Sequence, residues 1–143
     1  MLFLFQEGFI FNVKAAFPYK NINIKANCNS FGIDYEELSN SNIHIHALDG
    51  AVKKDGPSAG IAITTAIISA FKKKKVANNI GATGEISLNG NILPIGGLKE
   101  KSIGAKKGNI DTIIIPTANK KDLEEIEDEI KNGINYIEVS NYM

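Results

Sequence analysis

One serine stands where a polar loop changes into a long apolar run. Ser58 follows Gly56 and Pro57 and precedes Ala59 and Gly60, so we expect its hydroxyl in the first turn of a helix. Backbone N–H groups at a helix N-terminus are unpaired, and those of Ser58 and Ala59 can stabilise an oxyanion when the hydroxyl attacks a carbonyl. The alternative is that Ser58 only caps the helix, the commonest role of serine at such a position.

A serine nucleophile needs a base, and the usual base is a histidine. His44 and His46 alternate with isoleucines within residues 42–48, a pattern that predicts a half-buried strand with both imidazoles on one face. A lysine can do the same work in a dry environment, because burial disfavours the ammonium form and lowers the pKa of a lysine. The chain therefore offers two kinds of base.

Two lysines follow a double glycine in the segment Gly96–Lys101. On a helix that starts there, Lys101 shares a face with the apolar residues Leu98 and Ala105, whereas Lys99 points away from that face. We therefore expect Lys101 to face inward. The alternative is an exposed helix lysine paired with a neighbouring glutamate, the more common situation for a lysine.

The elements that must position these residues follow from hydrophobic periodicity and from glycine, proline and asparagine signals. The helices that we predict are a kinked or broken one in residues 6–30, a buried central one over 58–71, one over 98–107, and one from Asn119 to about Lys131 that ends at Gly133. The predicted strands are 86–88, 91–93, 112–116 and 136–139.

Two local features of this prediction concern a turn and a cluster of charges. Asn89 and Gly90 join the first two strands, and this pair is typical of a type I′ hairpin turn because both residues tolerate a positive φ. The lysines 72–75 follow the central helix, where we expect a solvated cap that complements the helix dipole. The fold expected is α+β: a small mixed sheet that includes the hairpin, packed against the central helix and two further helices.

Length and composition exclude several classes of protein. The 143 residues suit one domain, and 43% hydrophobic with 22% charged residues is typical of a globular chain. Sixteen lysines and no arginine balance sixteen acidic residues, so nucleic acid is not an expected partner. No apolar run is long enough for a membrane span, and the lone Cys28 indicates a reducing, intracellular compartment.

Several motifs together carry a resemblance to a known family. They are Lys-Asp-Gly-Pro-Ser-Ala-Gly at 54–60, Thr-Gly-Glu-Ile at 83–86, and Leu-Pro-Ile-Gly-Gly-Leu-Lys-Glu-Lys at 93–101. The His-x-His strand and the segment 116–126 extend the match over about 31–139. The chain resembles the proteolytic domain of ATP-dependent Lon proteases, and the serine and lysine motifs lie in the family's order.

The resemblance implies a Ser-Lys dyad that requires no metal. Ser58 would be the nucleophile, and Lys101 the general base that later protonates the leaving amine. Thr83 matches a threonine that helps to orient the lysine, and Asp55 an aspartate that can pair with the lysine in an inactive arrangement. The matching histidines, His44 and His46, are expected to pack behind the site, since no third ligand at a suitable spacing supports a metal centre.

The resemblance also implies a larger assembly around this domain. The family has further strands before its first helix, so we expect residues 1–143 to be a single Lon-type domain, N-terminally truncated and excised from a longer ATPase–protease chain. We expect the chain alone to be a weak or inactive peptidase. The parent would be a homo-hexamer that binds ATP and Mg²⁺ in its ATPase domain and degrades unfolded or damaged polypeptide. Its location would be the bacterial cytoplasm or the mitochondrial matrix.

A second hypothesis belongs to another functional class. Lon-like domains also occur in proteins that hydrolyse nothing, so the chain could be a non-catalytic assembly or chaperone module of the same fold. The presence of both Ser58 and Lys101 favours the serine endopeptidase, because a module without catalysis has no need for either side chain at these positions.

Overall fold

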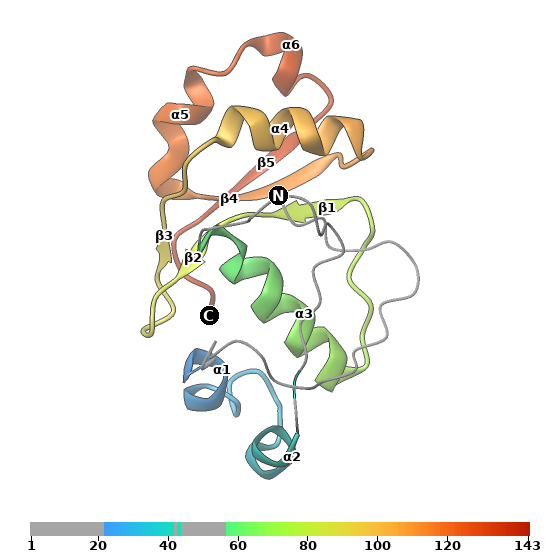
Figure 1. The fold of residues 1–143 in the computed structure, drawn as a ribbon, viewed down its shortest axis with the longest axis vertical. Helices are drawn as coiled ribbons and strands as arrows, with labels where there is room; N and C mark the ends of the chain where they lie inside the picture. The colour runs from blue at the N-terminus through green and yellow to red at the C-terminus, as the bar shows by residue number, and fades with distance from the viewer. Residues whose placement is uncertain (1–21, 42, 44–56) are drawn as a thin grey trace.

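Three strands form a parallel sheet in the computed structural model of the chain, which describes residues 22–41, 43 and 57–143. In chain order they are β1 (Ile80–Ala82), β4 (Thr112–Pro116) and β5 (Asn135–Val139). The middle strand of the sheet is β4, whose Ile114 pairs with Ala82 of β1. Because all three strands run in one direction, their carboxyl ends share one edge of the sheet (Figure 1).

One face of the sheet is covered by three helices. These are α4 (Leu98–Lys107), α5 (Lys120–Glu124) and α6 (Asp128–Lys131). Ile113 and Ile115 of β4 point to this face and are fully buried against Leu98 and Ala105 of α4. The bounds of α4 and β4 confirm the two elements as predicted, since a glycine pair precedes the helix and a proline ends the strand.

Among the described residues, the opposite face of the sheet is covered by α3 (Gly60–Lys72) (Figure 1). Ile61 and Ala62 of this helix pack with Ala82 of β1, and Ile114 of β4 joins them because side chains alternate along a strand. The predicted central helix is confirmed, although its first turn, Pro57–Ala59, is a 3₁₀ helix.

A third apolar cluster lies on the far side of α3 from the sheet. There α1 (Ile22–Ala26) and α2 (Tyr35–Asn40) bury Ile24 and Leu38 against Ile67 of α3. The cluster also buries Cys28, which is a free cysteine. Of the helix predicted in residues 6–30, the structure describes residues 22–30, of which 22–26 form α1 and 27–30 form turns.

The expectation that residues 72–75 form only a solvated cap is wrong for Lys72. Its Nζ donates a 2.7 Å hydrogen bond to the carbonyl oxygen of Phe31, which lies between α1 and α2. The carbonyl of Phe31 provides a fixed acceptor within reach of the end of α3. Lys72 therefore ties the α1–α2 connection to α3.

The predicted hairpin forms with a different turn. Its strands are β2 (Glu85–Ile86) and β3 (Ile92–Leu93), which form a two-stranded antiparallel sheet of their own. Of the two central residues predicted for the turn, Asn89 and Gly90, only Gly90 has a positive φ, at 82°. A type I′ turn needs a positive φ at both, so this turn is of another type. The Gly90 amide donates to the Ser87 carbonyl, the Ser87 amide donates to the Asn91 carbonyl, and the Ser87 hydroxyl accepts from the Asn91 amide. The loop therefore has three residues, 88–90, and Gly90 in the left-handed region lets the backbone groups of Ser87 and Asn91 pair.

Residues 140–142 pair with the outer edge of β3. The Ile92 amide donates to the Ser140 carbonyl at 2.9 Å, and the Tyr142 amide donates to the Gly90 carbonyl at 3.0 Å. The Tyr142 hydroxyl lies 2.7 Å from the Thr65 hydroxyl of α3, and its ring meets that of Phe31 edge to face. The segment thus joins the hairpin, α3 and the α1–α2 connection.

The single helix predicted from Asn119 to Lys131 is wrong. A 3₁₀ turn (Thr117–Asn119) leads into α5, and the chain leaves helical geometry before α6 begins at Asp128. Leu123, Ile126 and Ile130 keep the helical spacing that suggested one element, and all pack on the sheet. The break comes from contacts with α4, which binds residues of α6 as described below.

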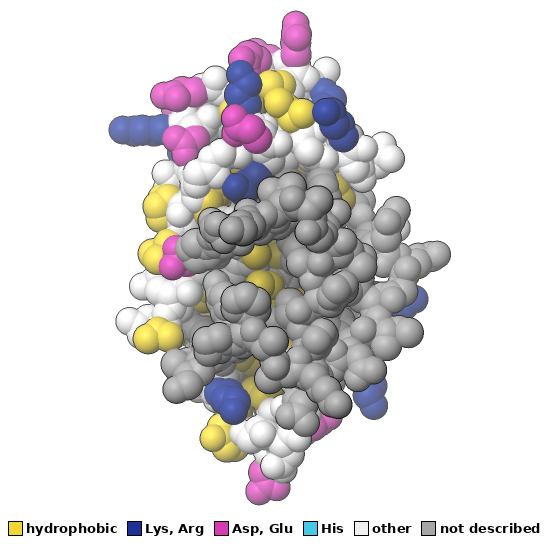
Figure 2. Space-filling view, in the orientation of Figure 1, with side chains coloured by type: hydrophobic (Ala, Val, Ile, Leu, Met, Phe, Trp, Pro, Cys, Tyr) yellow, Lys and Arg dark blue, Asp and Glu magenta, His cyan; other side chains and the backbone are white. Residues whose placement is uncertain are grey.

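Charged side chains of both signs mix at the end of the molecule formed by α4, α5 and α6 (Figure 2). No helix in the described part of the chain is long and apolar enough to cross a membrane. With its parallel and antiparallel strands and its covering helices, the fold confirms the expected α+β class.

Candidate active site

The turn that carries Ser58 is bonded to the chain just after β1. The Ser58 carbonyl oxygen accepts hydrogen bonds from the Gly84 amide at 2.8 Å and from the Thr83 hydroxyl at 3.2 Å. The Gly84 carbonyl in turn accepts from the Ile61 amide at 3.1 Å. These bonds on both sides of the α3 N-terminus hold Ser58 at the carboxyl edge of the sheet.

Two glycines allow this close approach of backbone to backbone. A Cβ on Gly60 would lie 2.8 Å from the Ile86 nitrogen and 3.0 Å from the Gly84 oxygen, and a Cβ on Gly84 would lie 2.5 Å from a carbon of Ile61. Such distances leave no room for a side chain at either position. The glycines around the serine are therefore needed for the contact between α3 and β2.

Ser58 itself does not cap α3. The N-cap residue is Ala59, which has no side chain that can cap, and Ser58 precedes it in the 3₁₀ turn. The Ser58 side chain is partly exposed. The structure thus assigns the N-cap of α3 to Ala59, and the role of the Ser58 hydroxyl as a nucleophile stays a prediction.

Lys101 lies in the first turn of α4 and binds the glycine pair before it. Its Nζ donates a 2.7 Å hydrogen bond to the Gly96 carbonyl, and its amide donates to the Gly97 carbonyl at 3.1 Å. Gly97 has a φ of 68°, which favours glycine. The Lys101 side chain is half-buried, as expected for the inward face.

Lys99 takes the outward direction predicted for it. Its exposed side chain pairs with Glu127, just before α6, at 2.5 Å. The hydrogen bond from Lys99 holds the pKa of the Glu127 carboxyl below its ordinary value. Lys106, about two turns further along the same face of α4, donates to the carbonyls of Glu129 and Asn132. These bonds fix α6 against α4 and account for the break after α5.

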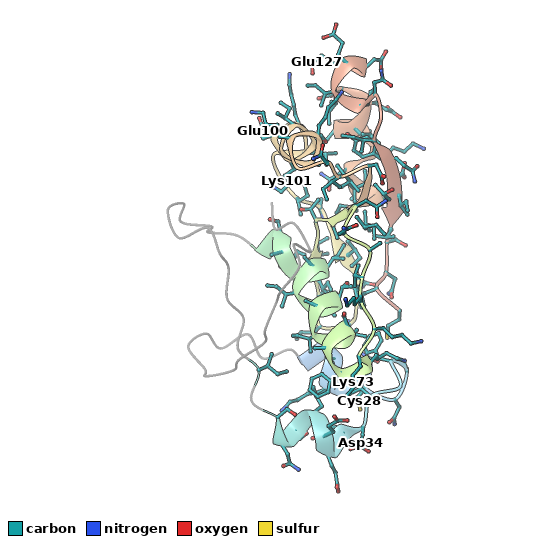
Figure 3. The ribbon with its side chains drawn as sticks, turned by 90° about the vertical axis from the view of Figure 1, so that its right-hand side faces the viewer. Cys28, Asp34, Lys73, Glu100, Lys101 and Glu127 are labelled. Carbon is teal, nitrogen blue, oxygen red and sulfur yellow. The ribbon has the colours of Figure 1, made fainter. Side chains whose placement is uncertain are left out.

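The topology brings Ser58 and Lys101 to the same edge of the sheet. Thr83 follows β1 and holds Ser58, while Asn119 follows β4 and binds the segment that precedes α4. Figure 1 shows that α3 and α4 start on the same side of the molecule. Figure 3 shows Lys101 on the flank of α4 nearest to the beginning of α3, with Glu127 at the far end of the molecule.

Thr83 is 1% exposed, and both its backbone and its side chain are bonded. Its amide donates to the Ile114 carbonyl at 3.0 Å, and its hydroxyl holds the Ser58 carbonyl. Thr83 thus positions the serine through its main chain. The predicted orientation of Lys101 by Thr83 stays a prediction.

Three candidate residues lie outside the described part of the chain: Asp55, His44 and His46. Within the described residues, no three His, Cys, Asp or Glu side chains gather as metal ligands. Asn119 also belongs to this edge, although its sequence context predicts only a helix cap. Its side chain makes no cap and instead binds the backbone of Ile95, 24 residues away in sequence.

Comparisons with known proteins identify the family of the chain. Residues 12–143 match the family model described as the Lon protease (S16) C-terminal proteolytic domain. The chain belongs to this family. It is 52% identical over 118 residues to the Lon protease of Aster yellows witches'-broom phytoplasma, and 47% identical over 129 residues to that of Desulfatibacillum aliphaticivorans.

These matches cover 82% and 90% of this chain and 15% of each relative. A third relative, the Lon protease of Metamycoplasma arthritidis, is 50% identical over 83% of the chain and 14% of its own length. The chain therefore spans about a seventh of the length of these bacterial relatives. The match is to a proteolytic domain, which supports the serine peptidase hypothesis and not the non-catalytic assembly module.

Proposed function

We propose that Ser58 and Lys101 form the catalytic dyad of this Lon proteolytic domain. The observation that supports the proposal most directly is their common edge: each residue lies near the start of a helix, and the segment at each helix start is bonded to residues that follow a parallel strand, β1 or β4. Ligands and active sites in open α/β sheets gather at this kind of edge. On this proposal a peptide that binds along this edge contacts both side chains.

In the acylation step, the Lys101 amine takes the proton of the Ser58 hydroxyl while Oγ bonds to the carbonyl carbon of the peptide. The N–H groups of Ser58 and Ala59 stabilise the negative oxygen of the tetrahedral intermediate. The Lys101 ammonium then gives its proton to the leaving amine as the C–N bond breaks. A water molecule completes the cycle by the same route, with release of the acid and of free Ser58.

The remaining assignments of the site also belong to this proposal. Thr83 orients the dyad, and Asp55 silences it in an inactive arrangement by pairing with the Lys101 ammonium. His44 and His46 pack behind the site and bind no metal. Each role rests on the resemblance of its motif, and for Thr83 also on the bond to the Ser58 carbonyl.

The full protein that carries this domain is proposed to act as an ATP-dependent endopeptidase on unfolded polypeptide. ATP and Mg²⁺ would bind outside this domain, and six copies would form a ring. The bacterial origin of the relatives and the buried, free Cys28 support a reducing cytoplasm as its location.

The deciding experiment measures cleavage of a fluorogenic peptide by the full-length protein. Ser58→Ala and Lys101→Ala should each lower kcat by several orders of magnitude, roughly the loss that follows removal of a nucleophile or its base. Matched controls are Ser69→Ala, at the opposite end of α3, and Lys99→Ala, on the outer face of α4; both should cleave at close to the wild-type rate. Wild-type cleavage by Ser58→Ala would overturn the proposal.

A further inference from the structure

The side chain of Asn119 is 1% exposed, and its amide is fully hydrogen-bonded. Its Oδ1 accepts from the Ile95 amide at 3.0 Å, and its Nδ2 donates to the Ile95 carbonyl at 2.7 Å and to Asp122 at 2.5 Å. The amide thus pairs with both polar groups of one residue, as a neighbouring strand would. A buried amide in such a position is costly to replace, since its partners would be left unpaired.

The residue that Asn119 holds comes directly before the two glycines that bind Lys101. Within the described part of the chain, no heavy atom lies within 4 Å of the place where a Cβ on Gly96 would be, so no described side chain contacts Gly96 from that side. Its carbonyl nevertheless accepts the hydrogen bond of the Lys101 Nζ. The position of this carbonyl therefore depends on the backbone of Ile95.

The hydrogen bond to Gly96 has a direct chemical consequence for a lysine base. A neutral amine has one lone pair, and donation of an N–H to a fixed carbonyl restricts where that lone pair can point. The carbonyl accepts equally from the ammonium, so the nitrogen keeps its place while it gains and loses a proton. A displacement of about 1 Å can reduce such a step on the order of a hundredfold.

We infer that Asn119 is a positioning residue for Lys101, acting through the Ile95 and Gly96 backbone. It is the counterpart of Thr83: each is a buried polar residue just after a parallel strand, and each holds the backbone next to one member of the dyad. This inference rests on the dyad proposed above. It adds a residue that touches neither substrate nor the reacting atoms.

The test compares Asn119→Asp and Asn119→Ser in the full-length protein. Asn119→Asp keeps the shape of the side chain but loses the donor to the Ile95 carbonyl and places a like charge beside Asp122. We expect kcat for a fluorogenic peptide to fall about 10- to 100-fold, with KM changed less than twofold. A thermal melt of each variant first shows that it is folded at the assay temperature, and kcat is compared only among folded variants.

The matched control is Asn79→Asp, which makes the same change at the opposite edge of the sheet. Asn79 Nδ2 donates to both carboxylate oxygens of Asp111, at 2.9 and 3.0 Å. This variant also loses an amide donor and gains a like charge, so it should lower the melting temperature. Its kcat per folded molecule should match that of the wild type.

A double-mutant cycle separates positioning from a general loss of stability. The substrate is a peptide p-nitrophenyl ester, whose leaving group needs no proton, so Lys101→Ala retains a measurable rate. In that background Asn119→Ser should cause no further loss, because the residue on which Asn119 acts is gone. An equal loss with and without Lys101 would overturn the inference.

The outcomes also distinguish the inference from the proposed function. If Ser58→Ala and Lys101→Ala lose peptidase activity while both folded Asn119 variants keep the wild-type kcat, the dyad stands and the role of Asn119 is wrong. If Ser58→Ala cleaves normally, the dyad itself is wrong. If Asn119→Asp does not fold, Asn119→Ser and the cycle decide the question.

Discussion

The hydroxyl of Thr83 donates a hydrogen bond to the carbonyl oxygen of Ser58 across 3.2 Å, beside the bond from the next amide in the chain. This contact joins the end of β1 to the turn that carries the nucleophile. The Thr83 side chain contacts the main chain of Ser58 here. The hydroxyl donor of Thr83 should therefore matter more for the position of Ser58 than the shape of the side chain.

The donor of Thr83 can be removed with almost no change in shape. Thr83→Val should lower kcat for peptide cleavage by about fivefold, since one hydrogen bond contributes about 1 kcal/mol and a tenfold change in rate corresponds to about 1.4 kcal/mol. Thr83→Ser keeps the hydroxyl and should stay within about threefold of the wild type. An equal loss in both variants would mean that the methyl group, and not the hydroxyl, is what the site needs.

The charge state of the base gives a second prediction. Arginine keeps its charge at any accessible pH and cannot accept the serine proton, so Lys101→Arg should abolish cleavage although it preserves charge and reach. Lys99→Arg can still pair with Glu127 and should be nearly harmless. Peptide cleavage assays on the two variants check the assignment, and a dead Lys99→Arg with an active Lys101→Arg would reverse it.

The close approach at Gly60 predicts an effect on stability. A Cβ there would meet only backbone atoms of Gly84, Glu85 and Ile86, which cannot rotate away. Gly60→Ala should therefore lower the free energy of unfolding by about 1–3 kcal/mol, the usual cost of overpacking. Gly96→Ala, where a Cβ meets open space, should change it by less than about 0.5 kcal/mol in the same urea titration.

Alkaline pH should weaken the fold through Tyr142. Burial raises the pKa of its hydroxyl above the ordinary value, and the hydrogen bond with Thr65 only partly opposes this. The folded state therefore keeps its proton at a pH where the unfolded chain has lost it, so stability falls as the pH rises above about 10. In urea titrations, Tyr142→Phe should have a free energy of unfolding about 1 kcal/mol below that of the wild type at neutral pH. Its free energy of unfolding should then fall less steeply than that of the wild type as the pH rises above about 10.

Local signals in the sequence were sufficient for the elements that glycine and proline delimit. The double glycine predicts the start of α4, and Pro116 predicts the end of β4; both bounds are confirmed. The hairpin was predicted at the right place with the wrong turn, because Asn89-Gly90 is compatible with two loop lengths. The choice between them depends on Asn91, which pairs with Ser87 and with residues after β5.

The break between α5 and α6 and the role of Asn119 were beyond prediction for a related reason. The periodic Leu123, Ile126 and Ile130 look the same in one helix as in two, and the break follows from bonds to lysines of α4. The sequence predicts Asn119 as a helix cap, because an asparagine directly before a helix start commonly caps it. Its true partner is 24 residues away, and no local pattern reports such a pairing.

The bond between Thr65 and Tyr142 spans 77 residues of sequence. A ribosome that adds 5–20 residues per second makes Tyr142 about 4–15 s after Thr65. Throughout that interval the nascent chain holds α3 without the segment that joins it to the hairpin, and the apolar surface under Tyr142 stays open to solvent and to chaperones. The link between the hairpin and α3 is thus completed only after residues 140–142 have been synthesised.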